Sequence, residues 1–225
     1  MIKRLNWDSD FFQLEVGELN YNDNKKVEFQ SHFDLIYLKS ESFSELNLPN
    51  FKKSFSETKV LFSKQISNVN PTYKKIKSSK EVTFDLDDLY TLSFESGKFS
   101  RFNLDANFKT TDFKKLYKIW IDNSINFEFA TEVLLYLEQD KITGFVTYKI
   151  KDDFATIGLI SVLPENQGKG IGKKLILEVE NRLFQKKIKN LSIPTQLENE
   201  VACSFYLSLG YKIIEKTHIS HYWKI

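Results

Sequence analysis

Apolar positions in the first part of the chain fall into short alternating runs, a spacing typical of β-strands. Such runs occur at residues 35–38, 58–66 and 81–86, with polar clusters between them. The sequence then carries turn-forming residues and a Ser96-Gly97 pair, which favour a loop. We therefore predict a domain junction near residues 88–98. It divides the chain into a small N-terminal domain at 1–92 and a larger domain at 93–225.

The larger part of the chain alternates between helical and strand patterns. Residues 110–126 space apolar side chains three and four apart, which predicts a helix that Thr111 or Asp112 caps. Residues 133–164 predict three strands of an antiparallel meander, with turns at 139–141 and 151–153. After them we expect a helix from Gly170, a strand at 190–195, a helix at 198–209 that stops at Gly210, and one or two closing strands.

The segment PENQGKGIGKKLI at 164–176 contains three of the eight glycines: Gly168, Gly170 and Gly172. It lies between a predicted strand and a predicted helix, so backbone N–H groups and the positive end of the helix dipole converge there and attract phosphate. Glycine lets the backbone close around an anion and take positive φ. The neighbouring Lys169, Lys173 and Lys174 add positive charge. A plain glycine turn before a core helix is the alternative.

Two common phosphate-binding motifs do not fit this loop. The nucleotide-triphosphate motif fails because Lys174 stands where a hydroxyl is needed, and the dinucleotide fingerprint fails because Leu175 replaces its last glycine. The pattern Gln167-x-x-Gly170-x-Gly172, preceded by Val162-x-Pro164, resembles instead the acetyl-CoA pyrophosphate motif of the GNAT family of N-acetyltransferases.

A second stretch carries the same resemblance. A helix of the form Asn-x-x-Ala-x-x-x-Tyr-x-x-x-Gly-Phe is typical of the family, and Asn199, Ala202, Tyr206 and Gly210 match it, with Tyr211 in place of phenylalanine. The resemblance implies an α+β fold, in which helices flank a mixed, mostly antiparallel sheet, and acetyl-CoA as cosubstrate. From its position alone, Tyr206 could equally be a core aromatic residue.

The resemblance assigns acetyl-CoA binding to a strand end, the glycine loop and the second helix. The residues are Ile160, Ser161, Val162, Gln167, Gly168, Lys169, Gly170, Ile171, Gly172, Lys173, Asn199, Ala202 and Tyr206.

The start of the chain resembles a narrower group. LNWDSDFFQLEVGEL, SRFNLDANF and LYKIWIDNS are similar to segments of the TDP-fucosamine acetyltransferases, which acetylate the 4-amino group of a TDP-linked 4-amino-4,6-dideoxygalactose. This resemblance implies a small N-terminal domain of partial GNAT topology on a complete GNAT domain, with the sugar nucleotide between them. It also implies a role in surface polysaccharide synthesis, of lipopolysaccharide or enterobacterial common antigen.

Attack of an amine on a thioester needs a neutral amine, a stabilised oxyanion and a protonated leaving thiolate. The resemblance places the general acid at Tyr206 and a base, acting through water, at Glu57. It places the oxyanion donors near residues 160–162, where such folds bulge. Arg101, with Phe102, is the candidate for binding substrate, because its planar fork engages two oxygens at once. A solvated glutamate and a surface ion pair are the alternatives for Glu57 and Arg101.

Composition and charge narrow the partners. The formal net charge of +2, from 32 basic and 30 acidic residues, indicates neither nucleic acid nor an anionic membrane. The N-terminus lacks the apolar core of a signal peptide, so we expect a cytoplasmic location. The single cysteine, Cys203, and three histidines support neither a disulfide nor a metal site. We expect small-molecule partners, and the sequence leaves open whether the chain forms a homodimer.

The acetyl-CoA motif does not encode the acceptor. A protein N-terminus or another small amine is therefore the alternative acceptor. A non-catalytic module that binds acyl-CoA is the alternative outside catalysis.

Overall fold

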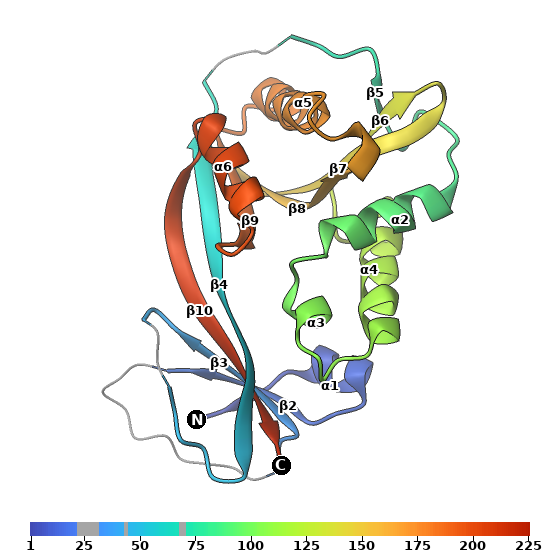
Figure 1. Ribbon diagram of the computed structural model, residues 1–225. Coiled ribbons are helices and arrows are strands. Elements are labelled where there is room, and N and C mark those ends of the chain that lie inside the picture. The colour runs from blue at the N-terminus through green and yellow to red at the C-terminus, as the bar shows by residue number, and fades with distance from the viewer. Residues whose placement is uncertain (22–31, 43–44, 68–70) are drawn as a thin grey trace.

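The computed structural model describes residues 1–21, 32–42, 45–67 and 71–225 (Figure 1). The strands of this part are β1 (Lys3–Arg4), β2 (Val16–Asn20), β3 (Leu35–Ser40), β4 (Phe51–Gln65), β5 (Ile76–Ser78), β6 (Glu132–Glu138), β7 (Lys141–Lys151), β8 (Phe154–Val162), β9 (Asn190–Gln196) and β10 (Lys212–Lys224). The helices are α1 (Asn6–Phe12), α2 (Leu86–Ser96), α3 (Arg101–Leu104), α4 (Thr110–Ile125), α5 (Ile171–Gln185) and α6 (Glu200–Ser208), with a 3-10 turn at Pro164–Asn166. No helix among the described residues is long and apolar enough to cross a membrane.

The described strands form one ten-stranded sheet in the order β1-β2-β3-β10-β4-β9-β8-β7-β6-β5. The longest pairing in the sheet is the antiparallel pair of β4 and β10. It runs from Lys212↔Ser63 to Lys224↔Phe51 and contains two register shifts. β3 pairs with the C-terminal half of β10, and β9 pairs with the C-terminal half of β4. The first strands of the chain therefore lie at one end of this pair, and the glycine-loop region lies at the other (Figure 1).

The two central strands β8 and β9 separate along their length. They pair in parallel at Phe154↔Asn190, Ala155↔Leu191 and Thr156↔Ser192. Their later residues, 157–162 on β8 and 193–196 on β9, line a cavity instead. The sheet thus opens toward the carboxyl ends of both strands.

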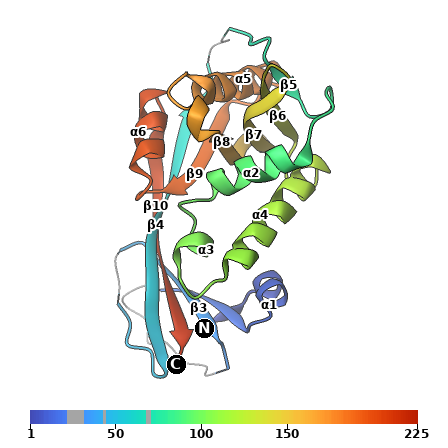
Figure 2. The same ribbon diagram turned by 45° about the vertical axis from the view of Figure 1, so that its right-hand side comes forward.

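Helices cover both faces of the sheet, and the alternation of apolar residues in β6 shows how. Leu134 and Tyr136 belong to a core cluster with residues of α5 and α6. Val133 and Leu135 belong to a second cluster with α2 and α4. Successive residues of a strand point to opposite faces, so α5 and α6 cover one face and α2 and α4 the other (Figures 1 and 2).

Most of the predicted elements are confirmed. The antiparallel meander is β6, β7 and β8, and its turns hold Gln139, Asp140 and Asp152 at positive φ. The final helix ends before Gly210, whose φ of +86° is the left-handed conformation that glycine tolerates. The closing segment is one strand, β10.

Two local predictions are wrong, namely the strand at 81–86 and the cap of the helix at 110–126. Residues 81–85 form no strand, because Asp85 caps α2 by accepting a hydrogen bond from the Asp87 N–H. The helix α2 then covers most of the expected junction at 88–98. Helix α4 begins at Thr110, where the predicted segment begins, but its N-cap is Lys109, without a side-chain hydrogen bond, so neither Thr111 nor Asp112 caps it. The division into two domains at residue 92 stays a prediction. The strands β4 and β10 join the first strands of the chain to the later strands in one sheet.

Candidate active site

A cavity of about 1000 Å³ opens where β8 and β9 separate. The glycine loop borders it at one end, and residues of α1, α3, β3 and β4 border it at the other. Almost all of the predicted site residues line this single cavity: Glu57, Arg101, Phe102, Ile160, Ser161, Val162, Gln167, Gly168, Gly170, Ile171, Gly172, Lys173, Asn199, Ala202 and Tyr206.

The glycine loop leaves its backbone donors free. Gly168 and Gly170 have φ of +74° and +75°. Within the described part of the chain, no hydrogen bond uses the backbone N–H groups of residues 168–173. The Gln167 side chain closes the loop by donating to the Val162 carbonyl at 3.0 Å. Free N–H groups at the start of α5 form an anion site together with the helix dipole, which fits a diphosphate.

Two lysines of the glycine loop differ in whether they line the cavity. Lys173 lines the cavity. Lys169 is not among the lining residues, and its charge acts on Glu138, whose pKa it helps to lower behind the larger effect of Lys75. The prediction that Lys169 binds acetyl-CoA through its side chain therefore has no support from the cavity geometry.

Tyr206 lies in the cavity wall with only 5% of its surface exposed. Its ring packs among aromatic neighbours, with centroids 5.5 Å from Phe62 and 5.3 Å from Phe205. Burial raises the pKa of its phenol well above the ordinary value. Tyr206 thus keeps its proton at neutral pH, which is the state a general acid needs.

The N-terminus of α6 explains another residue of the motif. Asn199 is the N-cap, and its side chain accepts a hydrogen bond from the Ala202 N–H at 3.2 Å. This cap fixes the start of the helix that presents Tyr206.

The bulge of β8 lies earlier than predicted. The pairing of β7 with β8 shifts between Val146↔Ile160 and Tyr148↔Ile157, so the irregularity falls at Gly158 and Leu159 rather than at 160–162. The Leu159 N–H donates to the Thr147 hydroxyl at 2.9 Å, so Thr147 already occupies one of the freed donors. Residues 160–162 still line the cavity, at the edge of β8 that no longer pairs with β9.

Glu57 is a buried acid, with 7% of its surface exposed, rather than a solvated one. Burial raises the pKa of its carboxyl to about 7, and the opposing attraction of Arg101 is smaller. Its Oε2 is buried and has no hydrogen-bond partner among the described residues. A carboxyl of this kind exchanges a proton near neutral pH, as a general base must.

Arg101 is the first residue of α3, and Ser100 caps that helix. Its guanidinium carbon lies 4.3 Å from the centre of the Tyr37 ring and 4.8 Å from that of Phe102. Its Nη1 is buried without a partner among the described residues. The alternative of a surface ion pair is therefore wrong, and Nη1 is a buried donor that no described residue satisfies.

Phe102 is 9% exposed and mostly serves the aromatic core. Its ring packs on Phe12 at 5.6 Å and on Phe108 at 5.4 Å, while one edge reaches the cavity.

The structure adds cavity residues that the sequence did not reveal. They include Trp7, Asp8, Lys39, Lys59, Tyr117, Trp120, Ile219 and the β9 residues at 194–196. The signal for Lys39 and Ile219 was strand register, since they lie side by side with Glu57 across β3, β10 and β4. No group of three or more His, Cys, Asp or Glu side chains in the described ranges could hold a metal ion.

The acetyltransferase (GNAT) family model matches residues 87–211, which is more than half of the chain. The chain therefore belongs to the GNAT acetyltransferase family. The matched span contains the glycine loop and Tyr206, but it excludes Trp7, Asp8 and Glu57.

Two curated proteins share part of this chain. The ribosomal protein bS18-alanine N-acetyltransferase of Haemophilus ducreyi is 33% identical over 81 residues, 36% of this chain and 56% of that protein. The uncharacterized protein YxbD of Bacillus subtilis is 30% identical over 76 residues, 34% of this chain and 46% of that protein. The chain thus spans about half the length of the curated relatives it matches.

Solved structures share the fold. A putative GNAT acetyltransferase from Novosphingobium aromaticivorans aligns with a TM-score of 0.56 at 13% identity, over 85% of this chain and 75% of that chain. The PaiA N-acetyltransferase of Thermoplasma acidophilum, solved in complex with coenzyme A, aligns with a TM-score of 0.50 at 24% identity, over 67% of this chain and 99% of that chain. These likenesses confirm the predicted α+β fold.

Proposed function

We propose that this protein transfers the acetyl group of acetyl-CoA to the amino group of a nucleotide-linked amino-deoxy sugar in surface polysaccharide synthesis. One observation carries the proposal: a single cavity joins the open glycine loop to the buried Glu57. The Glu57 end of that cavity is built largely by residues outside the family-matched span, such as Trp7 and Lys39. The N-terminal part of the chain thus adds acceptor-binding residues to a cavity whose cofactor-binding loop lies in the family-matched span.

At the cofactor end, the free N–H groups of residues 168–173 bind the diphosphate of acetyl-CoA. The pantetheine then follows the opening between β8 and β9, which leads past Tyr206. This path delivers the thioester to the middle of the cavity.

At the acceptor end, Glu57 removes a proton from the ammonium group, directly or through water, and the free amine attacks the thioester carbonyl. Backbone N–H groups of residues 160–162 stabilise the oxyanion. Collapse of the tetrahedral intermediate breaks the C–S bond, Tyr206 donates its proton to the leaving thiolate, and the proton that the attacking nitrogen loses restores the Tyr206 phenol. Arg101 holds an oxygen of the acceptor with the donor that the protein leaves unsatisfied.

A protein N-terminus is the second candidate acceptor. The relative from Haemophilus ducreyi, named for acetylating the alanine of ribosomal protein bS18, favours it. That likeness covers 36% of this chain, so it bears on only part of the cavity.

The test compares acceptors side by side. Purified protein is mixed with acetyl-CoA and either TDP-4-amino-4,6-dideoxygalactose or a peptide with the N-terminal sequence of bS18. Free thiol and the acetylated product are measured. We expect saturable transfer to the sugar nucleotide and little to the peptide. Efficient transfer to the peptide with none to the sugar nucleotide would overturn the proposal in favour of the second candidate.

A further inference from the structure

Helix α1 places two consecutive residues, Trp7 and Asp8, in the wall of the cavity. Neither has a part in the chemistry described above. Both belong to the acceptor end, because α1 lies beside α3 and the first strands, at the opposite end of the molecule from α5 (Figures 1 and 2).

Trp7 exposes 47% of its surface although it lines a cavity. One face of its indole stacks on Phe11, with ring centres 5.0 Å apart and planes 9° from parallel. The stack fixes the orientation of the indole and leaves the other face accessible. An accessible aromatic face in a cavity favours a flat apolar partner.

Asp8 is half-buried and lines the same cavity. Burial raises the pKa of its carboxyl, and the charge of Arg101 opposes this shift. The same guanidinium acts on Glu57, so Asp8 and Glu57 share Arg101 as a neighbour. A carboxylate only accepts hydrogen bonds and has room for about four of them. The Tyr37 hydroxyl and a backbone N–H already act on the Asp8 carboxylate, which leaves room for hydroxyl or N–H donors of a ligand.

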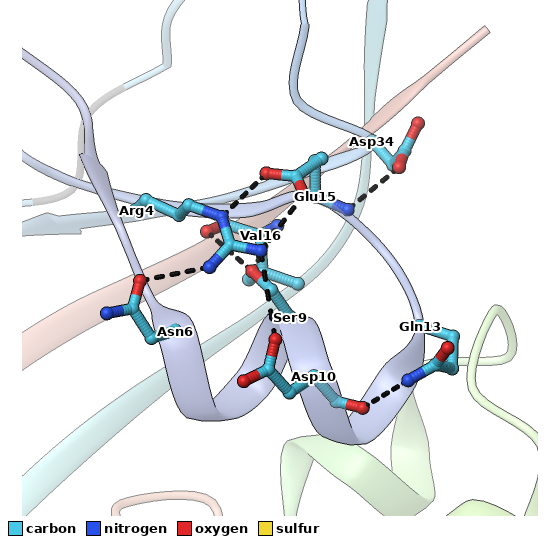
Figure 3. A network of polar contacts seen from close by, with 8 residues as sticks. All are labelled: Arg4, Asn6, Ser9, Asp10, Gln13, Glu15, Val16 and Asp34. Carbon is cyan, nitrogen blue, oxygen red and sulfur yellow. Dashed lines mark hydrogen bonds and ion pairs between the residues drawn. The ribbon is translucent and has the colours of Figure 1, made fainter.

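The segment that carries both residues is held rigidly (Figure 3). Arg4 forms two hydrogen bonds with the Glu15 carboxylate, at 2.8 and 3.0 Å, which join the strand before α1 to the segment after it. The Val16 N–H donates to the Ser9 hydroxyl at 3.0 Å, and the Glu15 N–H donates to Asp34 at 2.8 Å. A ligand that binds to α1 therefore meets a preorganised surface.

We propose that Trp7 and Asp8 form the subsite for the sugar ring of the acceptor: the free indole face packs on the C–H face of a pyranose, and the Asp8 carboxylate accepts hydrogen bonds from its hydroxyls. A pyranose combines an apolar face with a rim of hydroxyl donors, so it matches an aromatic plane beside a carboxylate. Because the charge of Arg101 acts on both acids, the ring places a hydroxyl at Asp8 and its amine at Glu57. This assignment rests on the proposed function and names the residues that select a sugar over a peptide.

Kinetics on the full-length protein test the role of Asp8. Asp8→Asn keeps the shape of the side chain and weakens its acceptor strength. We expect the KM for TDP-4-amino-4,6-dideoxygalactose to rise about tenfold or more, as loss of a charge-assisted hydrogen bond predicts. The KM for acetyl-CoA should stay unchanged. Asp10→Asn is the matched control, because Asp10 lies exposed on the same helix and does not line the cavity.

Tryptophan fluorescence tests the stacking directly. TDP-6-deoxygalactose, which has no amine, is titrated into the CoA-loaded protein in parallel with TDP alone. We expect an emission change with the sugar nucleotide that TDP does not produce, that Trp7→Phe abolishes, and that persists in Trp120→Phe. Both Trp7→Phe and Trp7→Leu should raise the acceptor KM, with the larger effect for leucine, and thermal unfolding verifies that each variant folds.

The outcomes separate the two proposals. If the wild type acetylates the sugar nucleotide but Asp8→Asn and Trp7→Leu leave its KM unchanged, the subsite is wrong and the proposed function stands. A full emission change with TDP alone would mean that the base stacks on Trp7, which also overturns the subsite. If the wild type neither binds nor acetylates any sugar nucleotide, the proposed function fails and the subsite fails with it.

Discussion

The imidazole Nδ1 of His221 lies 2.7 Å from the carboxylate Oδ2 of Asp105, deep inside the protein. A carboxylate only accepts, so Nδ1 carries the proton and donates. Burial lowers the pKa of His221 to about 4, which keeps the ring neutral near pH 7. Burial alone would raise the pKa of Asp105, but hydrogen bonds from His221 and Trp223 hold it well below its ordinary value. The pair links the end of α3 to β10.

The pair of His221 and Asp105 contacts elements that hold Arg101. Asp105 directly follows α3, the helix that begins with Arg101. The His221 ring lies 4.8 Å from the ring of Tyr37, on which the Arg101 guanidinium rests at 4.3 Å. Both the backbone and the side chain of Arg101 are therefore held by contacts that depend on His221.

The first prediction is that His221 positions Arg101. His221→Leu removes the donor to Asp105, and we expect the acceptor KM to rise about tenfold while kcat stays within a factor of about three. His221→Asn places an amide donor near the position of Nδ1 and should restore most of the affinity. In an Arg101→Ala background, His221→Leu should have little further effect on the acceptor KM. Independent, additive effects in the double variant would show that the pair only stabilises the fold.

The second prediction concerns the pH dependence of activity. Because burial raises the pKa of Glu57 to about 7, the base form is lost below neutral pH. We expect kcat/KM for the acceptor to rise with an apparent pKa near 7. Glu57→Gln should lower kcat about 100-fold and remove that inflection. A profile with the same inflection in Glu57→Gln would exclude Glu57 as the base.

The same shift predicts how Glu57 affects stability. The folded chain binds the Glu57 proton more tightly than the unfolded chain, whose carboxyl has the ordinary pKa of 4.5. Its contribution to stability is therefore complete below pH 4.5 and is lost as the pH rises through 7. Denaturant unfolding at several pH values should show Glu57→Gln gaining stability relative to the wild type between pH 5 and 8. A constant difference over that range would contradict the burial of an ionisable carboxyl here.

The third prediction concerns the leaving group. Tyr206→Phe removes the phenol and leaves the packing against Phe62 and Phe205 intact. We expect kcat to fall about 100-fold with the KM for acetyl-CoA unchanged. The fall should be smaller for an acetyl thioester whose thiol is more acidic, because such a thiolate leaves without protonation. An equal loss with both thioesters would exclude proton donation to the leaving thiolate, and no loss with either would mean that Tyr206 is a packing residue.

The fourth prediction tests the glycine loop. Gly170 has φ of +75°, and a Cβ there would meet no atom within 4 Å, so Gly170→Ala costs only backbone strain. We expect a stability loss of about 1 kcal/mol and a clear loss of CoA affinity, because the N–H groups shift. Gly210→Ala is the matched control, since Gly210 has φ of +86° with equally open space but does not line the cavity. It should lose similar stability and keep its affinity for CoA.

The cofactor half was predictable because its signals are local. Gly168 and Gly170 take positive φ, and Tyr206 and Asn199 lie about two helical turns apart on the same segment. Sequence spacing therefore fixed their relative placement. The same reasoning failed at residues 81–96, where short apolar runs of similar composition suit either a strand or a helix and the Asp85 cap decides.

The acceptor end was harder to predict because it depends on long-range pairing. Lys39, Glu57 and Ile219 come together only through the register of β3, β4 and β10. The bond between Asp105 and His221 joins positions 116 residues apart. Trp7 and Asp8 lie in the segment that resembles the TDP-fucosamine acetyltransferases. A helix of seven residues is too short for its apolar spacing to show which cavity they face.

A crystal structure of the protein with bound CoA tests the central claim most directly. We predict that the diphosphate oxygens accept hydrogen bonds from backbone N–H groups of residues 168–173, with the thiol beside the Tyr206 hydroxyl. CoA bound elsewhere, or a diphosphate without contacts to those N–H groups, would contradict the account.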